Sequence, residues 1–348
     1  MRKLLLNLLL LFFFSEILSA QNSSKMDDEG AVVFMYHRFG DSRYPSTNIR
    51  MEQFEAHLQY LSQNGYNVWS LSKIVRHILE GREIPKKVVA LTIDDAYKSI
   101  YTNAFEKFKK YNFPFTVFVN STSIDSGSKN YMSWDEMREM QAFGAEFANH
   151  STTHDYMLPQ EGEDEQSWKK RIKEQIESAQ KRLQEELGET TNENPKLFSY
   201  PFGEYTKESA EYIQSLGYIG ITQTSGAIGM HSDTRTLPRF AMSEAYADMD
   251  GFTLKLKTLP LPIESVSSIE PLVKEENPPK LTIKLKHPLK NVGCYLSSGK
   301  AITVEWLSDR EFSVQADEAL KAPRDRYTCT APSNDGRWYW YSHLWIVK

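Results

Sequence analysis

The feature that most constrains the fold is an alternation of short apolar runs with amphipathic segments between Ala31 and Thr222. Val88 to Ile93 is almost continuously apolar, as expected for a parallel strand that is covered on both faces. Residues 54–61 instead repeat apolar side chains at helical spacing, and Gly65 follows them as a stop signal. Strand and helix repeated in this order predict an α/β domain, whose functional groups gather at the carboxyl ends of the strands.

The other predicted strands and helices between residues 31 and 222 follow the same patterns, apolar runs for strands and helical spacing for helices. Ser133-Trp134-Asp135-Glu136 is a capping box that opens a helix. A long polar helix runs from about Glu163 to Leu187, and Gly188 stops it. The remaining strands are predicted at residues 31–35, 115–119, 146–149, 197–200 and 219–222, and two further helices at 100–111 and around residues 213–216.

The first twenty residues differ in character from the rest of the chain. Arg2 and Lys3 precede the apolar run Leu4 to Phe14, and Leu18-Ser19-Ala20 offers a cleavage site. This order is typical of a secretory signal peptide, and the run is shorter than the roughly 20 residues that a membrane-spanning helix needs. We therefore predict that residues 1–20 are removed, that the mature chain is periplasmic or secreted, and that it keeps no stable membrane insertion. An uncleaved N-terminal anchor is the alternative.

Composition narrows the class of protein and its partners. Hydrophobic residues make up 40% and charged residues 25% of the chain, which are ordinary values for a globular protein. The formal net charge of −5, without a stripe of basic residues, argues against nucleic-acid binding. Only two cysteines are present, Cys294 and Cys329, and in an exported chain such a pair predicts a disulfide bond.

A change of composition divides the chain near its last quarter. Residues 264–279 are charged, contain several prolines and show no period, which predicts a linker between a domain at residues 21–263 and a second one at 280–348. The second domain is rich in β patterns and ends in the aromatic strand Trp338-Tyr339-Trp340-Tyr341. Alternate rings of such a strand should face the core, so glycan binding and a role in packing are both open.

Two adjacent acids, Asp94 and Asp95, close the apolar run Val88 to Ile93. Neighbouring carboxylates at the end of a buried strand repel each other and resist desolvation, and a bound cation relieves that cost. One acid can then hold a metal ion while the other takes a proton from water. A helix cap or an ordinary turn is the alternative.

Two more candidate segments also follow predicted strands. His150 and His154, four residues apart, can share one face of a helical turn and hold one ion, although this spacing also occurs by chance on solvated helices. Tyr200-Pro201-Phe202-Gly203 predicts a sharp turn that can aim a peptide N–H, with an ordinary strand-to-helix turn as the alternative.

The order of these three motifs resembles that of the polysaccharide deacetylases of the NodB-homology type, carbohydrate esterase family 4, over about residues 31–245. The resemblance implies an irregular (β/α) barrel. It also implies one residue set for the reaction: Asp95, His150 and His154 hold a divalent metal, commonly zinc, Asp94 is the general base, the Phe202 N–H stabilises the oxyanion, and Tyr200 and Pro201 contact substrate.

This chain departs from the usual family pattern at two places. Most members carry an arginine where this chain has Ser199, and the usual histidine acid late in the domain is missing. His37, after the first strand, is similar to the acid of a circularly permuted subgroup typified by exported poly-N-acetylglucosamine deacetylases. We therefore expect His37 to be the general acid and Met35 to line the acetyl pocket. Arg239 is a possible partner of Asp94, and a solvated surface arginine is the alternative.

Three other histidines are weaker candidates for the site. His231 lies in a loop rich in Gly and Ser and is a rival to His37 as the acid. His57 and His77 lie in helical segments among alternating polar groups, so both are interpreted as surface residues.

The C-terminal domain carries a second recognisable pattern. Cys294, Trp306, Tyr327 and Cys329 follow one another at spacings that resemble those of an immunoglobulin-like β-sandwich. That resemblance implies that Trp306 packs on the disulfide and that the Tyr327 hydroxyl closes a corner.

The predicted function is metal-dependent hydrolysis of the N-acetyl groups of N-acetylglucosamine units in an envelope or extracellular polysaccharide. Peptidoglycan is favoured because of the predicted location, and poly-N-acetylglucosamine or a chitin-type polymer is the alternative. A catalytically weakened glycan-binding protein on the same fold is a further alternative, favoured by Ser199 and by the missing late histidine. Asp94 and Asp95 argue against it, because buried acids without a function are costly.

Overall fold

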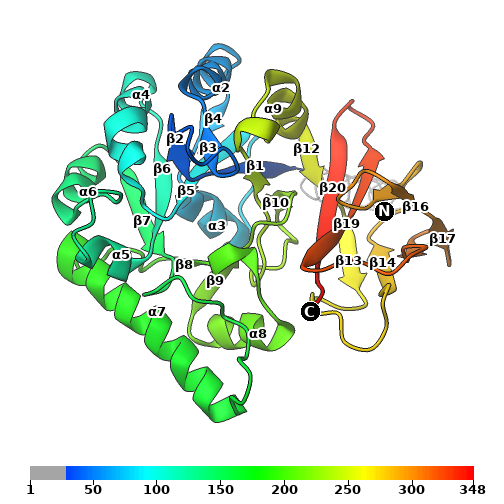
Figure 1. Cartoon of the computed structure of the whole chain (residues 1–348). Helices are drawn as coiled ribbons and strands as arrows, with labels where there is room; N and C mark the ends of the chain where they lie inside the picture. Colours follow the sequence, from blue (N-terminus) through cyan, green and yellow to red (C-terminus); the bar gives the residue numbers. More distant parts are fainter. Residues whose placement is uncertain (1–28) are drawn as a thin grey trace, which may run out of the picture.

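Residues 29–348 are described by a computed structural model, and the predicted signal peptide lies outside this range. Within these residues, no helix combines the length and apolar character needed to cross a membrane. Helices surround a central sheet in the first two thirds of the chain, and the C-terminal strands pack at one side of it (Figure 1).

The central sheet confirms the α/β class. Six strands run parallel in the order β1-β5-β6-β7-β8-β9, and β10 pairs antiparallel with β1 at one edge. Their bounds are β1 Gly30–Tyr36, β5 Val88–Asp94, β6 Phe115–Val119, β7 Ala145–Asn149, β8 Lys196–Ser199, β9 Tyr218–Ile221 and β10 Ala227–Gly229. Short strands β2 Arg38–Phe39, β3 Asn48–Ile49 and β4 Asn67–Val68 complete this part.

The sheet is an open path of strands, so the irregular (β/α) barrel that was expected is not closed. Between β9 and β1 lies an irregular segment, in which Leu237 forms an isolated bridge with Ile221 and β11, Phe240–Ala241, pairs with β1. Pro238 interrupts this segment and has no N–H to donate to a ladder. A full strand therefore does not form at the place where a barrel would close.

Helices cover both faces of the central sheet (Figure 1). The long polar helix α7, Glu165–Leu187, and the capping box at Ser133 and Glu136 are as predicted. His57 is completely buried because its ring stacks on Phe252 at 3.8 Å, so its interpretation as a surface residue was wrong. The other helices are α2 Met51–Gln63, α3 Leu71–Leu79, a π-helix Ile100–Ala104, α4 Phe105–Tyr111, α5 Ser121–Asp125, α6 Trp134–Gln141, α8 Lys207–Ser215 and α9 Met249–Leu256, with short 3₁₀ turns at Pro201–Gly203 and Glu244–Tyr246.

Two sheets form the C-terminal part. One has the order β12-β20-β19-β15-β16 and the other β13-β14-β18-β17. The first sheet comprises β12 Thr258–Pro260, β20 Trp338–Ile346, β19 Arg324–Pro332, β15 Gly293–Tyr295 and β16 Ala301–Ile302. The second comprises β13 Ile263–Val266, β14 Leu281–Leu285, β18 Glu311–Val314 and β17 Val304–Trp306.

The predicted linker is shorter than expected, because β13 occupies its first residues and pairs with β14. Ile263 and Val266 pack against the core of the C-terminal sheets, and this contact fixes the segment as a strand. Both β12 and β13 precede the predicted start of the second domain at residue 280. The exact domain limits stay a prediction.

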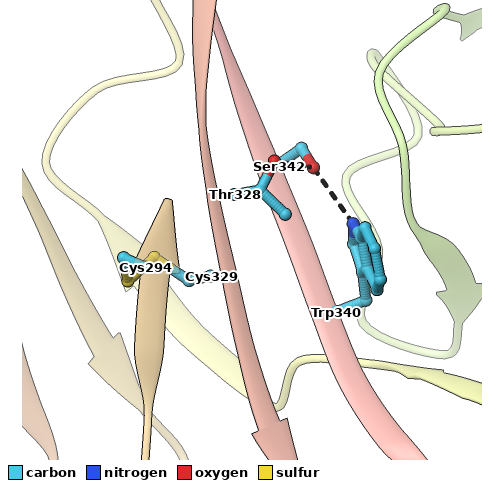
Figure 2. Close-up of a disulfide and its surroundings, with 5 residues drawn as sticks. All are labelled: Cys294, Thr328, Cys329, Trp340 and Ser342. Carbon is cyan, nitrogen blue, oxygen red and sulfur yellow. Dashed lines mark hydrogen bonds between the residues drawn. A yellow bond between two sulfur atoms is a disulfide. The ribbon is translucent and has the colours of Figure 1, made fainter. Parts of the chain in front are cut away.

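A disulfide joins Cys294 on β15 to Cys329 on β19, while Trp340 projects from the other side of the same sheet (Figure 2). The Trp340 ring packs edge-on against Phe240 of β11, with ring centroids 5.4 Å apart. The Trp340 indole N–H donates to Ser342 Oγ at 3.2 Å. One face of this sheet thus belongs to the C-terminal core, and the other contacts the α/β part.

The aromatic residues of this region only partly follow the immunoglobulin-like pattern. The Tyr327 hydroxyl donates to the carbonyl of Pro279 at 2.9 Å and accepts from the Ala316 N–H, which matches the expected corner. Trp306 does not pack on the disulfide, because it lies on the edge strand β17 and is 40% exposed. The buried tryptophan of this core is Trp345, which lies on β20.

Candidate active site

Three side chains converge at the carboxyl end of the central sheet. Asp95 follows β5, whereas His150 and His154 follow β7. The backbone N–H groups of Asp95 and His150 donate to carbonyls of β6, the strand between them, which explains why the two residues are neighbours. Asp95 Oδ1 lies 3.4 Å from His150 Nε2 and 3.3 Å from His154 Nε2, and the three ligand atoms all lie within 4.8 Å of one another.

The donor atoms of this cluster fit a divalent metal ion. Asp95 Oδ1 and His150 Nε2 are both buried without a hydrogen-bond partner, a costly state unless a cation satisfies them. His150 Nδ1 lies 2.7 Å from the carbonyl oxygen of Ser199, which can only accept, so Nδ1 carries the proton and Nε2 keeps its lone pair. One carboxylate and two imidazoles are ligands that zinc prefers.

The electrostatics of the cluster favour positive charge between the three side chains. Burial raises the pKa of Asp95, but the close approach of the His150 imidazole and the neighbouring histidine charges outweigh it and hold that pKa well below its usual range. Burial lowers the pKa of His150, but the nearby carboxylates of Asp95 and Asp94 raise it above the usual value. Burial, with the charge of His150, lowers the pKa of His154 to about 4.

Arg239 forms a fully buried, two-pronged ion pair with Asp94. Its Nη1 and Nη2 atoms lie 2.7 and 2.8 Å from the two carboxylate oxygens, and neither side chain is exposed. Arg239 also donates to Thr92 Oγ1, Ser199 Oγ and the carbonyl of Thr222. A planar guanidinium with all these partners has little freedom to move, so it fixes the orientation of Asp94.

The charge of Arg239 also sets the ionisation of Asp94. Burial raises the pKa of Asp94, but the opposing charges of Arg239 and His150 hold it below its usual range. The Asp94 carboxylate is therefore ionised at neutral pH. Ser199 occupies the position where most family members carry arginine, and its hydroxyl accepts a hydrogen bond from Arg239. The positive partner of Asp94 thus comes from a different segment of the chain.

His37, Met35 and Phe202 surround this centre. His37 follows β1, the strand beside β5, and its charge acts on both Asp94 and Asp95. Phe202 lies in the turn after β8 with φ of 60°, and its ring packs edge-on against His154 at 4.5 Å. Met35 and Phe202 line a common cavity.

Strained backbone is concentrated at this site. Nine non-glycine residues among the described part of the chain have positive φ, and five of them lie in the loops just described. These five are Asp95, Ala96, Ser151, His154 and Phe202. Such conformations cost about 1–3 kcal/mol each and persist where the surrounding structure holds them, often at functional sites.

The part of this chain that matches a known protein family contains most residues of the candidate site. Residues 81–221 match the model of the family described as polysaccharide deacetylase. This chain carries a polysaccharide deacetylase domain. The match includes Asp94, Asp95, both histidines of the cluster and Phe202, whereas His37 and Arg239 lie outside it.

Individual relatives of the deacetylase domain are distant. The putative polysaccharide deacetylase YxkH of Bacillus subtilis is 26% identical over 215 residues, which cover 61% of this chain and 71% of the relative. The poly-β-1,6-N-acetyl-D-glucosamine N-deacetylase of Staphylococcus epidermidis is 23% identical over 242 residues, covering 63% of this chain and 81% of that protein.

Solved structures share the fold of the deacetylase domain. Streptococcus pyogenes deacetylase PplD, in complex with acetate, superposes with a TM-score of 0.57 at 21% identity, covering 66% of this chain and 99% of that one. IcaB from Ammonifex degensii gives a TM-score of 0.53 at 24% identity, covering 65% of this chain and 94% of that one.

Some predicted site residues of the deacetylase domain lie elsewhere than expected. His150 and His154 do not share a helical turn, because positive φ at Ser151 and His154 makes the segment an irregular loop. The Tyr200 side chain is completely buried, and its hydroxyl donates to the carbonyl of Arg235, so it does not line the cleft. Pro201 beside it is also buried.

One weaker candidate lies apart from the cluster, and two residues near it were missed. His231 lines a separate cavity with Trp340, between the central sheet and the C-terminal sheets. The sequence did not identify Thr92, which contacts Arg239, although it lies two residues before Asp94 and so on the same face of β5. Tyr156 was also missed, and its exposed ring stacks on Phe202 at 4.2 Å.

Proposed function

We propose that this protein removes acetyl groups from N-acetylglucosamine units of a polysaccharide, with a divalent metal held by Asp95, His150 and His154. The observation that carries the proposal is the convergence of these three ligand atoms, two of them buried and unpartnered, beside the ion pair of Asp94 and Arg239. A cluster that only stabilised the fold would leave those two atoms satisfied.

A divalent ion, with zinc as the proposed metal, supplies Lewis-acid polarisation of the acetamide carbonyl and of water when bound. Asp94 is proposed as the general base that accepts a proton from the attacking water. Each carboxylate oxygen has two lone pairs, so Asp94 keeps accepting capacity although Arg239 occupies one site on each oxygen. Fixed orientation and an ionised state are what a base at this position requires.

Two other residues are proposed to act on the carbonyl oxygen and on the leaving group. The Phe202 N–H is proposed to donate to the oxygen as negative charge develops on it, a form of stabilisation that often dominates catalysis. His37 is proposed as the general acid that gives a proton to the departing sugar amine. Met35, at the common cavity with Phe202, is proposed to line the acetyl pocket, and Pro201 remains a candidate contact through its backbone.

Peptidoglycan is the proposed polymer, in keeping with the predicted export of the chain. It is supported by a cavity of about 300 Å³ next to the site, whose lining includes Arg38, Arg43, Lys98 and Lys129 with a single acid, Asp41. The Arg38 guanidinium lies over the ring of Tyr97, two residues after Asp95. Such a basic wall attracts a polymer that bears carboxylates, as the stem peptides of peptidoglycan do. Poly-β-1,6-N-acetylglucosamine is the second candidate, because several relatives are named as N-deacetylases of that polymer.

Acetate release from purified polymers tests the proposal. We expect the wild-type protein to release acetate from peptidoglycan, to lose this activity with a chelator, and to regain it when zinc is added back. Higher activity on poly-β-1,6-N-acetylglucosamine than on peptidoglycan would make poly-β-1,6-N-acetylglucosamine the preferred candidate substrate. No acetate from either polymer or from chitooligosaccharides, with zinc bound, would favour the glycan-binding alternative.

A further inference from the structure

A cavity of about 310 Å³ lies next to the candidate active site, between the deacetylase domain and strand β19 of the C-terminal sheet. Met35 and Phe202 line it on the side of the deacetylase domain, and Arg324, Asp325 and Arg326 line it on the side of β19. Pockets of this size can hold a small ligand. The C-terminal sheet therefore reaches the same space as the residues proposed to act on the acetyl group.

Arg324 connects β19 directly to the turn that contains Phe202. Its Nη1 atom donates to the Phe202 carbonyl at 3.0 Å and lies 3.4 Å from Glu204 Oε1. The turn has positive φ at Phe202 and at Gly203, where an added Cβ would lie 2.6 Å from the Gln223 side chain. A charge-assisted hydrogen bond to a turn under these constraints restricts how the turn presents its peptide groups.

The next two residues of β19, Asp325 and Arg326, keep some polar side-chain atoms without a partner among the described residues. The Arg326 guanidinium makes no hydrogen bond or ion pair with any residue from 29 to 348. Asp325 Oδ1 accepts from the N–H groups of Ser297 and Arg326, while Oδ2 has no hydrogen bond to the described residues. A free guanidinium and a free carboxylate oxygen can bind neighbouring hydroxyl groups as donor and acceptor.

The rest of the cavity lining completes a surface suited to a sugar ring. Met35 and Leu344 supply apolar contact, and Gln223 and Thr224 add further polar groups. Mostly apolar walls with a few oriented polar groups are typical of small-molecule sites. The cavity opens beside the residues assigned to the acetyl group, so a polymer held at the active site would extend past it.

We propose that β19 forms an accessory subsite for the sugar unit next to the one that loses its acetyl group. In this subsite Arg326 and Asp325 bind the neighbouring sugar, and Arg324 is a positioning residue that acts through the Phe202 turn. This inference rests on the proposed function and gives the C-terminal sheet a part in substrate selection.

The first test measures kcat and KM of Arg326→Ala on the monosaccharide N-acetylglucosamine, which lacks a neighbouring sugar, and on its tetrasaccharide. Loss of one charge-assisted hydrogen bond should raise KM for the tetrasaccharide about tenfold or more, with a smaller effect on the monosaccharide. Arg310→Ala is the matched control, because Arg310 is an exposed arginine of the same C-terminal part that donates only to the carbonyl of Lys286. This control should keep the wild-type ratio between the two substrates.

The second test separates positioning by Arg324 from a general role in stability. Arg324→Ala should lower kcat on both substrates several-fold with an unchanged melting temperature, and Arg324→Lys should restore part of kcat. An equal KM effect of Arg326→Ala on both substrates, or wild-type kinetics in both alanine variants, would overturn the subsite while leaving the proposed function intact. A wild-type protein that releases no acetate from either substrate would instead contradict the proposed function, and this inference with it.

Discussion

Arg239 donates hydrogen bonds to both carboxylate oxygens of Asp94, although 145 residues separate the two in the chain. The pair is fully buried, and it lies next to the cluster of Asp95, His150 and His154. Ser199 stands where the family pattern has an arginine, and the positive partner of Asp94 comes instead from the segment between β10 and β11.

Replacing Arg239 should damage stability and catalysis together. Arg239→Ala leaves the Asp94 charge buried without its partner, so we expect the free energy of unfolding to fall by about 3–5 kcal/mol. Arg239→Lys cannot form the two-pronged contact and should recover only part of both properties. Urea unfolding and acetate release measure the two effects. Arg235→Ala, which breaks a partly exposed pair with Asp233, is the control and should lose much less. Wild-type stability in Arg239→Ala would contradict this account of the ion pair.

Replacing His37 should slow hydrolysis most for substrates whose leaving group needs a proton. We expect His37→Ala to lower kcat on an acetylated amino sugar about 10²- to 10⁴-fold, the usual contribution of a general acid. An activated aryl acetate has a leaving group that departs without protonation, so its hydrolysis should fall much less. The ratio of the two rates in wild type and variant is the measurement. An equal loss on both substrates would show that His37 does not act as the acid.

Lowering the pH should reduce the free energy of unfolding through two buried histidines, His57 and His343, which lie outside the candidate metal cluster. Burial lowers the pKa of both His57 and His343 to about 4, from an ordinary value of 6.5. The unfolded chain therefore binds more protons between these pH values, and the free energy of unfolding should fall as the pH drops from about 6.5 towards 4. Each residue can contribute up to about 1.4 kcal/mol per pH unit in this window.

Unfolding by urea at pH 7.5, 5.5 and 4.5 measures this dependence. His57→Gln and His343→Gln should each have a shallower slope than the wild type, because one linked proton is removed. A free energy of unfolding that stays constant from pH 7.5 to 4.5 in the wild type would contradict the assignment of buried neutral imidazoles.

The disulfide should stabilise the C-terminal sheets. Cys294 and Cys329 close a loop with a sequence separation of 35 residues, for which chain entropy predicts a stabilisation of about 3–4 kcal/mol. The double variant Cys294→Ser with Cys329→Ser should therefore show a lower melting temperature of the C-terminal part. Calorimetry of the oxidised protein and of the variant compares them, and equal melting temperatures would contradict a stabilising role.

The resemblance to the deacetylase family predicted which residues form the candidate metal cluster, and the alternation of strands and helices predicted only that they follow strands. In the structure Asp95 and His150 follow strands that flank β6, so they meet at one edge of the sheet. The sequence did not predict the loop from His150 to His154. A spacing of four residues also fits a helix, and no residue type in this segment indicates positive φ at Ser151 or His154.

Burial was harder to predict where the covering residues are distant in the chain. His57 looked exposed among polar neighbours, but Phe252 on α9 stacks on it and the carbonyl of Ala247 lies 2.9 Å from its Nε2 atom. Trp306 was expected in the C-terminal core, a position that Trp345 takes in the structure. The contact of Arg324 with the Phe202 turn likewise joins residues 122 positions apart, and no local pattern marks it.

The most direct test of the central claim is the zinc content of purified variants, measured together with acetate release. Wild type and Asp94→Asn should each bind about one ion per chain, and only the wild type should turn over at a normal rate. Asp95→Ala and His150→Ala should lose both the ion and the activity. If His150→Ala bound zinc and released acetate as the wild type does, the assignment of the metal centre to Asp95, His150 and His154 would be wrong.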